Sequence, residues 1–570
     1  MNNKMEVDSN LNVYEFIKES YQKHNAKTAF IFYGKKISFK YFFGMVDNCA
    51  LGLKRLGVQS GDIVTLCLPN IPQNATTFYA VAKLNAITDI IHPLTPMKQI
   101  IESMNETGSK ILITSDLVLR KSVINEKKVV YCNISEYMDL KHKIGYAFMN
   151  IRNPFKREES YINFNDLIKR TSNVNQSDKN ISNLYDTNNK KVVDKTINSN
   201  IDYTNKEKND VKKPLACILH SGGTTDKPKK VEISHYALNQ LVQKKQYYLL
   251  DERLENRVLY SVLPSFHGFG LCMNMHISLT FGMTQLLITK FKPKEAVKLI
   301  KKYKVSFING VPSVFYALLK RKEFNFKTAS SIDRCFVGGD NVSAELIKRF
   351  NAAVTNDENK MKLFEGYGLT ETIAVCAVNT PEAYKLGTSG RAVPNAEIAV
   401  IVDGKVAKCN TEGELCVHSD TLMNGYYSDE QATNNALKLH DGKLWMHTGD
   451  WGTVDIDGYI HFKQRIKHLI LRKGVNVFPS EVEDVIMRLD FVKQVCVVGK
   501  KKSDETQTVY AYVKLSDKNL RTEQTKDKIK DFVKKNLITY AVPEVVIFTA
   551  HFPRTDIGKI NTKYFENRPD

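Results

Sequence analysis

The residues most able to do chemistry lie between His220 and His235, where the sequence reads HSGGTTDKPKKVEISH. This stretch concentrates hydroxyl groups, small residues and lysines, namely Ser221, Gly222, Gly223, Thr224, Thr225 and Lys229. Small residues let backbone N–H groups approach a phosphate, hydroxyls donate to it, and ammonium groups neutralise it. The stretch differs from the GxxxxGK[ST] loop, because Lys229 follows a proline and no Ser or Thr comes after it. It indicates a polyphosphate-binding loop, with an ordinary polar turn as the alternative.

Other residues that could contact a ligand follow predicted strands further along the chain. They are His267 in PSFHGFG, Gly339 in the glycine pair after DRCFV, and Tyr367, Thr370 and Glu371 in GYGLTET. The loops at the carboxyl ends of parallel strands form the usual ligand crevice of an open α/β sheet. These loops are therefore predicted to line a ligand site.

The segment 11–116 supplies elements that could position such loops. Its apolar residues alternate between helical spacing, as in 41–56, and short buried runs, as in 61–68 and 111–114. Alternating strands and helices predict a largely parallel sheet. A further apolar run, 215–219, predicts a strand that leads into the phosphate loop.

The later part of the chain changes in pattern. Residues 387–463 form short β-rich runs joined by Gly and Asp turns, and the residues after them mix helical and strand patterns. We predict an α/β fold with a large N-terminal domain, residues 1–464, that contains parallel-sheet subdomains and a small β-rich subdomain. A small α+β C-terminal domain, residues 465–570, follows it.

A polar segment interrupts the large domain. The regular pattern decays after about residue 133, and residues 171–210 are rich in Asn, Lys, Ser and Asp. Such a composition cannot bury enough apolar surface to fold alone. We therefore expect a disordered insert over about 134–212.

The composition is that of a soluble globular protein, with 42% hydrophobic and 25% charged residues among 570. No apolar run reaches membrane-spanning length, and the N-terminus has no signal-peptide pattern. Ten cysteines stand singly, which suits a reducing compartment, so a cytoplasmic location is expected. The net charge of +20 comes without alternating basic and aromatic residues, so no nucleic-acid partner is predicted. Peripheral membrane contact and the oligomeric state stay open.

Several stretches carry a family resemblance, and they occur in a fixed order. They read SGGTTDKPKK (221–230), GYGLTET (366–372), HTGDWGTVDIDGY (447–459), RIKHLILRKGVNVFPSEVE (465–483) and PRTDIGKI (553–560). Together they resemble the motifs of the adenylate-forming superfamily, which includes acyl-CoA synthetases, firefly-type luciferases and the adenylation domains of peptide synthetases. The resemblance covers nearly the whole chain apart from the polar insert.

The resemblance implies ATP, Mg²⁺ and coenzyme A as cofactors and co-substrates. Thr224, Thr225 and Lys229 would hold the β- and γ-phosphates. Glu371 would bind Mg²⁺, with Thr224 as a second contact, because this hard ion prefers oxygen ligands. Thr370 would contact the α-phosphate.

The remaining implied roles concern the nucleoside and the second domain. Tyr367 would lie against adenine, Asp450 would accept from the ribose hydroxyls, and Arg465 would reach the ribose or a phosphate. Lys559 would neutralise charge on the carboxylate and the α-phosphate during adenylation. Lys467 would be the hinge of a mobile C-terminal domain, whose rotation brings the Gly474 loop beside the adenylate in place of Lys559. His267 would gate the acyl pocket.

The implied reaction has two steps: a carboxylate attacks the α-phosphorus of ATP, and the CoA thiol then attacks the acyl-adenylate. Phe266 and His267 offer no anion for an α-amino group, which favours a fatty or aryl acid. Asp226 and Lys230 stand where the family usually has glycine, and a carboxylate beside polyphosphate should repel it. The alternatives are an adenylate-forming enzyme with another acceptor (a carrier protein or luciferase-like oxidation) and a catalytically weak nucleotide-binding homologue.

Overall fold

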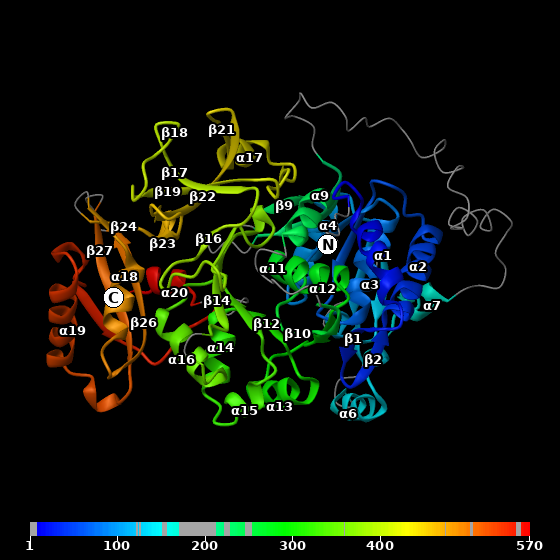
Figure 1. Ribbon diagram of the computed structural model, residues 1–570, viewed down its shortest axis with the longest axis horizontal. Helices are drawn as coiled ribbons and strands as arrows, with labels where there is room; N and C mark the ends of the chain where they lie inside the picture. The colour runs from blue at the N-terminus through cyan, green and yellow to red at the C-terminus, as the bar shows by residue number, and fades with distance from the viewer. Residues whose placement is uncertain are drawn as a thin grey trace.

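The fold was examined in a computed structural model (Figure 1). It describes residues 8–120, 124, 127–150, 155, 157–169, 213–221, 228–244, 254–357, 360–472, 475–501, 506–554 and 560–569. No helix among these residues is both long enough and apolar enough to cross a membrane.

The first sheet of the large domain is parallel over most of its width. Only its last two pairings, β8 with β9 and β9 with β20, are antiparallel. Its described strands are, in spatial order, β20 (Gly425–Tyr426), β9 (Lys230–Ser234), β8 (Leu215–His220), β4 (Ile87–Ile90), β3 (Ile63–Cys67), β5 (Ile111–Ser115), β6 (Lys128–Cys132) and β7 (Ile162–Asn163).

The second sheet is also parallel in its centre. In spatial order its described strands are β16 (Arg391–Ala392), β15 (Ala377–Val378), β14 (Leu363–Tyr367), β13 (Arg334–Val337), β12 (Phe307–Gly310), β10 (Val258–Ser261), β11 (Thr284–Leu287), β1 (Thr28–Phe32) and β2 (Lys35–Ser38). The predicted parallel sheet is therefore confirmed, but as two sheets.

Helices fill the space between the two sheets and cover their outer faces. One continuous core joins both sheets to the helices between them, α1 (Val13–His24), α2 (Phe39–Arg55), α3 (Pro72–Lys83) and α9 (His235–Gln243). A second core covers the other face of the second sheet with α13 (Pro293–Tyr303), α14 (Pro312–Leu319) and α16 (Ala344–Val354). A third packs α4 (Met97–Thr107) on the outer face of the first sheet.

The predicted β-rich subdomain is present, and its strands are antiparallel. It contains β17 (Ala396–Val402), β18 (Lys405–Val406), β19 (Gly413–Ser419), β21 (Leu437–His440), β22 (Lys443–Val454) and β23 (Ile460–Arg465), with α17 (Glu430–Ala436) beside them. It lies at the upper end of the molecule in Figure 1. The long strand β22 brings its far end down towards the second sheet.

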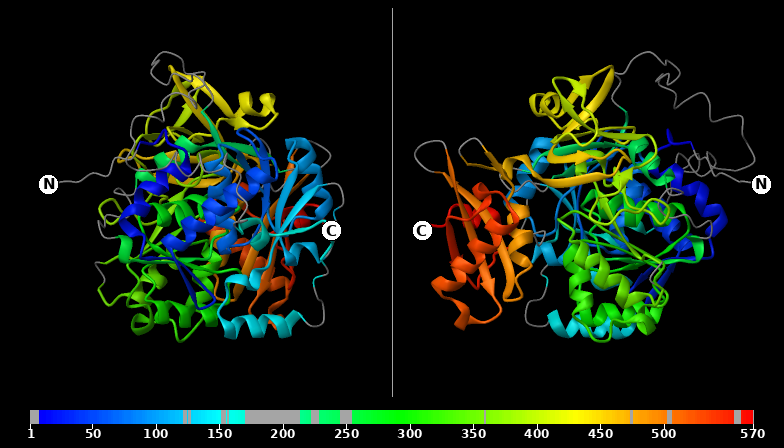
Figure 2. Two further views of the ribbon diagram at one scale, coloured as in Figure 1. Left: turned by 90° about the vertical axis from the view of Figure 1, so that its right-hand side faces the viewer. Right: turned by 60° about the vertical axis from the view of Figure 1, so that its left-hand side comes forward.

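The C-terminal part of the chain forms a separate small unit, at the left of Figure 1 and forward in the right-hand view of Figure 2. It buries its own cores, distinct from those of the large domain. Its elements are β24 (Ile470–Arg472), β25 (Val475–Val477), α18 (Pro479–Met487), β26 (Val492–Lys501), β27 (Gln507–Leu515), α19 (Glu523–Asn536), β28 (Val545–Phe548) and α20 (Thr562–Glu566). The predicted α+β C-terminal domain is therefore confirmed.

The expectation of a disordered insert from residue 134 is wrong at its start. Residues 134–150 form the 3-10 helix η1 (Ile134–Tyr137) and α6 (Leu140–Asn150), and 162–168 form β7 and α7 (Phe164–Ile168). Ile134, Tyr137, Phe164 and Leu167 are buried in the core, so a few well-spaced apolar residues hold this segment. Residues 170–212 lie outside the described part of the chain.

A buried polar cluster lies where α3 and α9 meet the π-helix η3 (Leu271–His276). His276, fully buried, contacts the Tyr79 hydroxyl through Nδ1 and Asn239 Oδ1 through Nε2, both at 3.0 Å. Asn239 Nδ2 donates to two backbone carbonyls, so its Oδ1 must accept from the imidazole. His276 therefore carries a proton on Nε2. Burial lowers the pKa of His276 to about 3.

This cluster predicts a specific sensitivity to acid. The folded pKa of His276 lies below its ordinary value, so its stabilising effect is present above about pH 6.5 and is lost as the pH falls. Between pH 7 and 5 the loss should reach about 2 kcal/mol, since each pKa unit is worth about 1.4 kcal/mol. Urea unfolding at both pH values should show a smaller acid-induced loss for His276→Gln than for the wild type. The exposed His551→Gln variant should behave as the wild type, and equal losses in all three would contradict the prediction.

Candidate active site

The predicted phosphate loop connects two antiparallel strands, β8 and β9. Its base is closed by the Ser221 N–H, which donates to the Lys229 carbonyl at 2.8 Å. The Lys229 ammonium lies 4.3 Å from the centre of the Tyr426 ring. Gly222, Gly223, Thr224, Thr225 and Asp226 lie outside the described residues.

Lys230 does not extend the positive charge of this loop. Its side chain is only 9% exposed, and its ammonium forms an ion pair with Glu106 of α4. The Lys230 side chain therefore points away from the phosphate loop and reaches the neighbouring helix α4.

Tyr426 connects the phosphate loop to Glu371. Its hydroxyl donates to Glu371 Oε1 at 2.8 Å, while its ring lies under Lys229. Burial, with the neighbouring Glu371 carboxylate, raises the pKa of Tyr426 well above its ordinary value, so the phenol stays a donor. Sequence reasoning missed Tyr426, because its position depends on the pairing of the short strand β20 with β9.

The turn that carries Thr370 and Glu371 is tightly held. Its backbone passes through Ile373, which is fully buried at φ +70°, a strained conformation for a β-branched residue. A Cβ at Gly268 would lie 1.6 Å from the Ile373 carbonyl oxygen, and one at Gly368 would lie 1.6 Å from that of Ala374. The two glycines therefore allow the neighbouring loops to clamp the turn.

His267 lies on the loop that packs against this turn. It is half-buried, and its ring centre is 4.8 Å from that of Phe266 and 6.4 Å from that of His92. Asn70 fixes the loop, since its Nδ2 donates to the Leu263 carbonyl at 2.8 Å and its Oδ1 accepts from the Ser265 N–H at 3.0 Å. The structure therefore brings the loop that carries His267 against the turn that carries Thr370 and Glu371, through Gly268 and Ile373.

Asp450 is the centre of a second cluster. It is 1% exposed; its Oδ1 lies 2.7 Å from Arg465 Nε, and its Oδ2 accepts from the Tyr367 hydroxyl at 2.6 Å. Asp450 and Arg465 are directly opposite on β22 and β23, whereas Tyr367 ends β14 of the second sheet. Burial, followed by the Asp450 carboxylate, raises the pKa of Tyr367 well above its ordinary value. Three predicted residues from two subdomains thus meet.

Two residues that sequence reasoning missed hold the backbone next to Asp450. Glu414 of β19 accepts from the Gly449 N–H through Oε1 and contacts His447 Nδ1 through Oε2, both at 2.8 Å. Each lies in a strand whose residues alternate between the two faces, and the sequence does not distinguish it from an ordinary surface residue. Only the register of β19 against β22 brings them together.

The other predicted residues have different positions. Gly339 follows β13 at φ +77°, and the adjacent Gly338 lies against the Gly366 carbonyl at the end of β14. Lys467 is exposed in the 3-10 helix η5 (Ile466–His468), directly after β23. Gly474 and Lys559 lie outside the described residues.

Glu371 is the described residue that was predicted to hold Mg²⁺. The Glu371 carboxylate is half-buried, and its Oε1 is the atom that accepts from Tyr426. A carboxylate can accept further contacts, and Mg²⁺ prefers one or two carboxylates together with phosphate oxygens. The described donor therefore fits Mg²⁺. Its second predicted contact, Thr224, lies outside the described residues.

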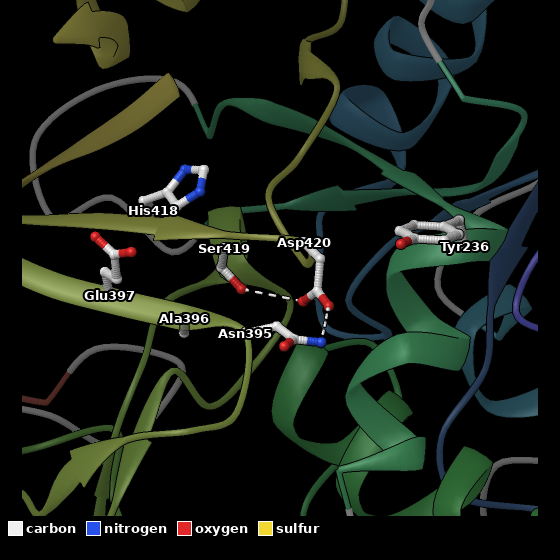
Figure 3. Close-up of a pocket in the computed structure, with 7 residues that line it drawn as sticks. All are labelled: Tyr236, Asn395, Ala396, Glu397, His418, Ser419 and Asp420. Atoms are coloured by element: carbon white, nitrogen blue, oxygen red, sulfur yellow. Dashed lines mark hydrogen bonds between the residues drawn. The ribbon is translucent and has the colours of Figure 1, made fainter. Parts of the chain in front are cut away.

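Figure 3 shows a polar pocket of about 570 Å³ between α9 and the β-rich subdomain. It includes none of the predicted site residues; its lining is Tyr236, Asn395, Ala396, Glu397, His418, Ser419 and Asp420. Its carboxylates already have partners, because Asp420 pairs with Lys244 and Glu397 lies 2.6 Å from the Lys443 ammonium. This pocket therefore lies apart from the Asp450 and Glu371 clusters, where the described candidate residues meet.

Two known proteins are similar to this chain over nearly its whole length. The chain is 26% identical over 559 residues to the long-chain-fatty-acid–CoA ligase of Bacillus subtilis, covering 97% of this chain and 93% of that protein. It is 27% identical over 552 residues to the probable 4-coumarate–CoA ligase 3 of Dictyostelium discoideum, covering 94% and 91%.

Solved structures share the fold. The ATP-bound crystal structure of MatB from Rhodopseudomonas palustris superposes with a TM-score of 0.76 at 20% identity, over 98% of each chain. The anthranilate CoA ligase AuaEII with anthranoyl-AMP gives a TM-score of 0.76 at 19% identity, over 99% of this chain and 98% of that one.

Family matches cover both parts of the chain. Residues 17–427 match the AMP-binding enzyme family, and residues 481–559 match the AMP-binding enzyme C-terminal domain. The first match includes the phosphate loop, the Glu371 turn and Tyr426, and the second ends at Lys559. The chain therefore belongs to the AMP-binding enzyme family.

Proposed function

We propose that this chain is an ATP-dependent acid–CoA ligase that acts through an acyl-adenylate on a fatty or aryl acid. The observation that supports it best is the meeting of Tyr367, Asp450 and Arg465 at the end of β14. Family membership and the names of the relatives, which include fatty-acid and 4-coumarate ligases, support the same reaction.

In the first step, a carboxylate oxygen of the acid attacks the α-phosphorus of ATP, and pyrophosphate leaves. No general base is required, because the acid is already ionised at neutral pH. Catalysis then consists of positioning and charge neutralisation. Lys229, with Thr224 and Thr225, holds the β- and γ-phosphates, and Thr370 contacts the α-phosphate.

Glu371 would hold Mg²⁺, which when bound supplies neutralisation of phosphate charge. Tyr426 orients the Glu371 carboxylate through its 2.8 Å hydrogen bond. Asp450 retains lone pairs for the ribose hydroxyls, while Arg465 and Tyr367 fix its orientation. Tyr367 and Gly339, at the ends of neighbouring strands, border the adenine.

In the second step, the CoA thiol attacks the acyl carbonyl, and AMP leaves. We propose that residues 1–464 stay fixed while residues 465–570 rotate about Lys467, exchanging Lys559 for the Gly474 loop. Gln464, the last residue before this boundary, contacts the smaller unit: its Oε1 accepts from the Ser480 N–H of α18 at 3.1 Å. His267, beside the Glu371 turn, gates the acyl pocket.

We also propose a cytoplasmic location. All ten cysteines are free, and nine of them are buried. Unpaired cysteines are typical of a reducing compartment.

The decisive experiment is ATP–pyrophosphate exchange with a panel of fatty and aryl acids, followed by CoA-dependent release of AMP. Acid-dependent exchange, with AMP release that requires CoA, is expected. Exchange without a CoA requirement would indicate another acceptor. No exchange with any acid, while ATP still binds, would indicate a nucleotide-binding homologue.

Tyr426→Phe tests the link between the phosphate loop and Glu371. The variant keeps the ring under Lys229 but loses the hydrogen bond to Glu371. A hydrogen bond to a charged group is worth about 1.5–3 kcal/mol, so we expect the KM for Mg·ATP to rise about tenfold or more. Tyr427→Phe, at the adjacent position, should leave the KM unchanged. An unchanged KM in Tyr426→Phe would argue against this role of Glu371.

A further inference from the structure

The outward face of α6 is apolar, the reverse of an ordinary surface helix. Leu140, Ile144 and Phe148 are 74%, 50% and 69% exposed. They are four residues apart and therefore lie on one side of the helix. We call these three side chains the α6 face. A contiguous exposed apolar patch of this kind marks an interaction site more often than scattered apolar residues do.

Polar and aromatic contacts hold α6 to the body of the molecule, and Tyr146 packs against the core. The His142 ring is 5.3 Å from that of Tyr33, and the N–H of Asp139, directly before α6, donates to the Tyr33 carbonyl at 3.3 Å. The Tyr146 hydroxyl donates to Asp116 Oδ2 at 3.0 Å. The helix is therefore anchored by its polar side, which leaves the α6 face directed outward.

Lysines accompany the α6 face at the same end of the molecule. The Tyr33 hydroxyl contacts Thr289 Oγ1 at 2.8 Å, which connects the anchor of α6 to the segment leading into α13. Helices α6, α13 and α15 (Phe326–Ala329) all lie along the lower end in Figures 1 and 2. The lysines within α13 and α15 are all exposed, and we call them the basic rim: Lys294, Lys298, Lys301, Lys302 and Lys327.

The spacing of the α13 lysines places their charges on one face of the helix. Lys294, Lys298, Lys301 and Lys302 follow an i, i+4, i+7, i+8 pattern, so they share one face, opposite the buried Ala296, Val297 and Ile300. Phe326 of α15, next to Lys327, is 41% exposed. This end of the molecule thus combines apolar side chains that can enter an interface with cations that can lie beside it.

We propose that this end of the molecule docks on an anionic lipid bilayer, with the α6 face in the interfacial region and the basic rim at the headgroups. Anionic headgroups attract clustered lysines, and apolar side chains gain by leaving water. The strength of such binding scales with the apolar area that enters the interface together with the attraction to anionic lipids. The inference goes beyond the proposed ligase activity and does not depend on it.

A second copy of the chain fits this face less well. Most homodimers are two-fold symmetric, so each patch would meet its own copy. The basic rims of two copies would then be brought close together, and like charges repel. A bilayer that carries negative charge has no such conflict.

The test is co-sedimentation of the full chain, without substrates, with phosphatidylcholine vesicles and with vesicles that also contain phosphatidylserine. We expect binding to the anionic vesicles that falls at high salt. The Leu140→Gln, Phe148→Gln double variant should bind at least about tenfold more weakly. The matched control is Leu439→Gln, Leu444→Gln, an exposed cross-strand pair on the β-rich subdomain at the opposite end. It should bind as the wild type does.

The charge contribution is tested separately. Lys298→Glu, Lys302→Glu should weaken binding to the anionic vesicles, whereas Lys534→Glu, Lys535→Glu on α19, with the same change in net charge, should not. Equal binding by the α6 variant and its control would overturn the proposal. So would equal binding to both vesicle types, or a wild-type dimer that dissociates in the α6 variant without any vesicle binding. The vesicle assay contains no substrate, so its result can be interpreted even if the chain has no ligase activity.

Discussion

Asp450→Asn is expected to lower kcat/KM for ATP by about 10²-fold or more. The buried carboxylate is placed to accept from two ribose hydroxyls, and hydrogen bonds to a charged acceptor are worth about 1.5–3 kcal/mol each. The amide keeps the size of the side chain but loses the charge that pairs with Arg465 at 2.7 Å. Initial rates of acid-dependent ATP–pyrophosphate exchange over a range of ATP concentrations provide the measurement.

The matched control is Asp455→Asn. Asp455 is also a buried acid of the same motif, and its Oδ2 lies 2.6 Å from the Lys385 ammonium. Both substitutions remove the charge of a buried carboxylate that pairs with a partly exposed cation, so both should lower the unfolding temperature. Only Asp450→Asn should raise the KM for ATP. If the two variants lose ATP affinity equally, Asp450 supports the fold and does not bind the ribose.

Lys559→Ala should separate the two half-reactions. We expect adenylation to fall by about 10²-fold or more, because the ammonium neutralises charge that develops on the bridging oxygens. Conversion of chemically prepared acyl-adenylate and CoA into thioester should continue at nearly the wild-type rate. Single-turnover measurements of each half-reaction check both statements.

Lys563→Ala is the appropriate comparison, since this lysine lies four residues further on, in α20 of the same unit. It should leave both rates unchanged. Equal loss of both half-reactions in Lys559→Ala would rule out the exchange of Lys559 and the Gly474 loop. That result would also argue against a rotation about Lys467 between the two half-reactions.

The fold was predictable where apolar spacing is regular. The predicted helix at 41–56 corresponds to α2, which buries one apolar face, and the run 61–68 contains β3, which is buried on both faces. The insert was placed too early, since in 134–169 a small number of apolar residues, such as Tyr137 and Phe164, is enough to anchor short elements. Composition averaged over a segment does not reveal such isolated anchors.

The candidate site was predictable where a motif keeps its residues together. Thr370 and Glu371 lie on one turn, and the antiparallel pairing of β22 with β23 sets Asp450 opposite Arg465. Tyr426 and Glu414 were missed, because neither stands in a pattern that distinguishes it from an ordinary strand residue. Lys230 could not be assigned either, since its partner Glu106 is far away in the sequence.

The sequence by itself determined the chemistry: the phosphate-binding composition, the order of the motifs, and the two-domain α/β organisation. These depend on residue type and local spacing, which are properties of the chain. The tertiary structure alone decided that Tyr426 joins Lys229 to Glu371, that Lys230 turns to Glu106, and that α6 directs apolar side chains outward. Each of these results from contacts between distant segments, which form only when strand pairing and helix packing bring them together.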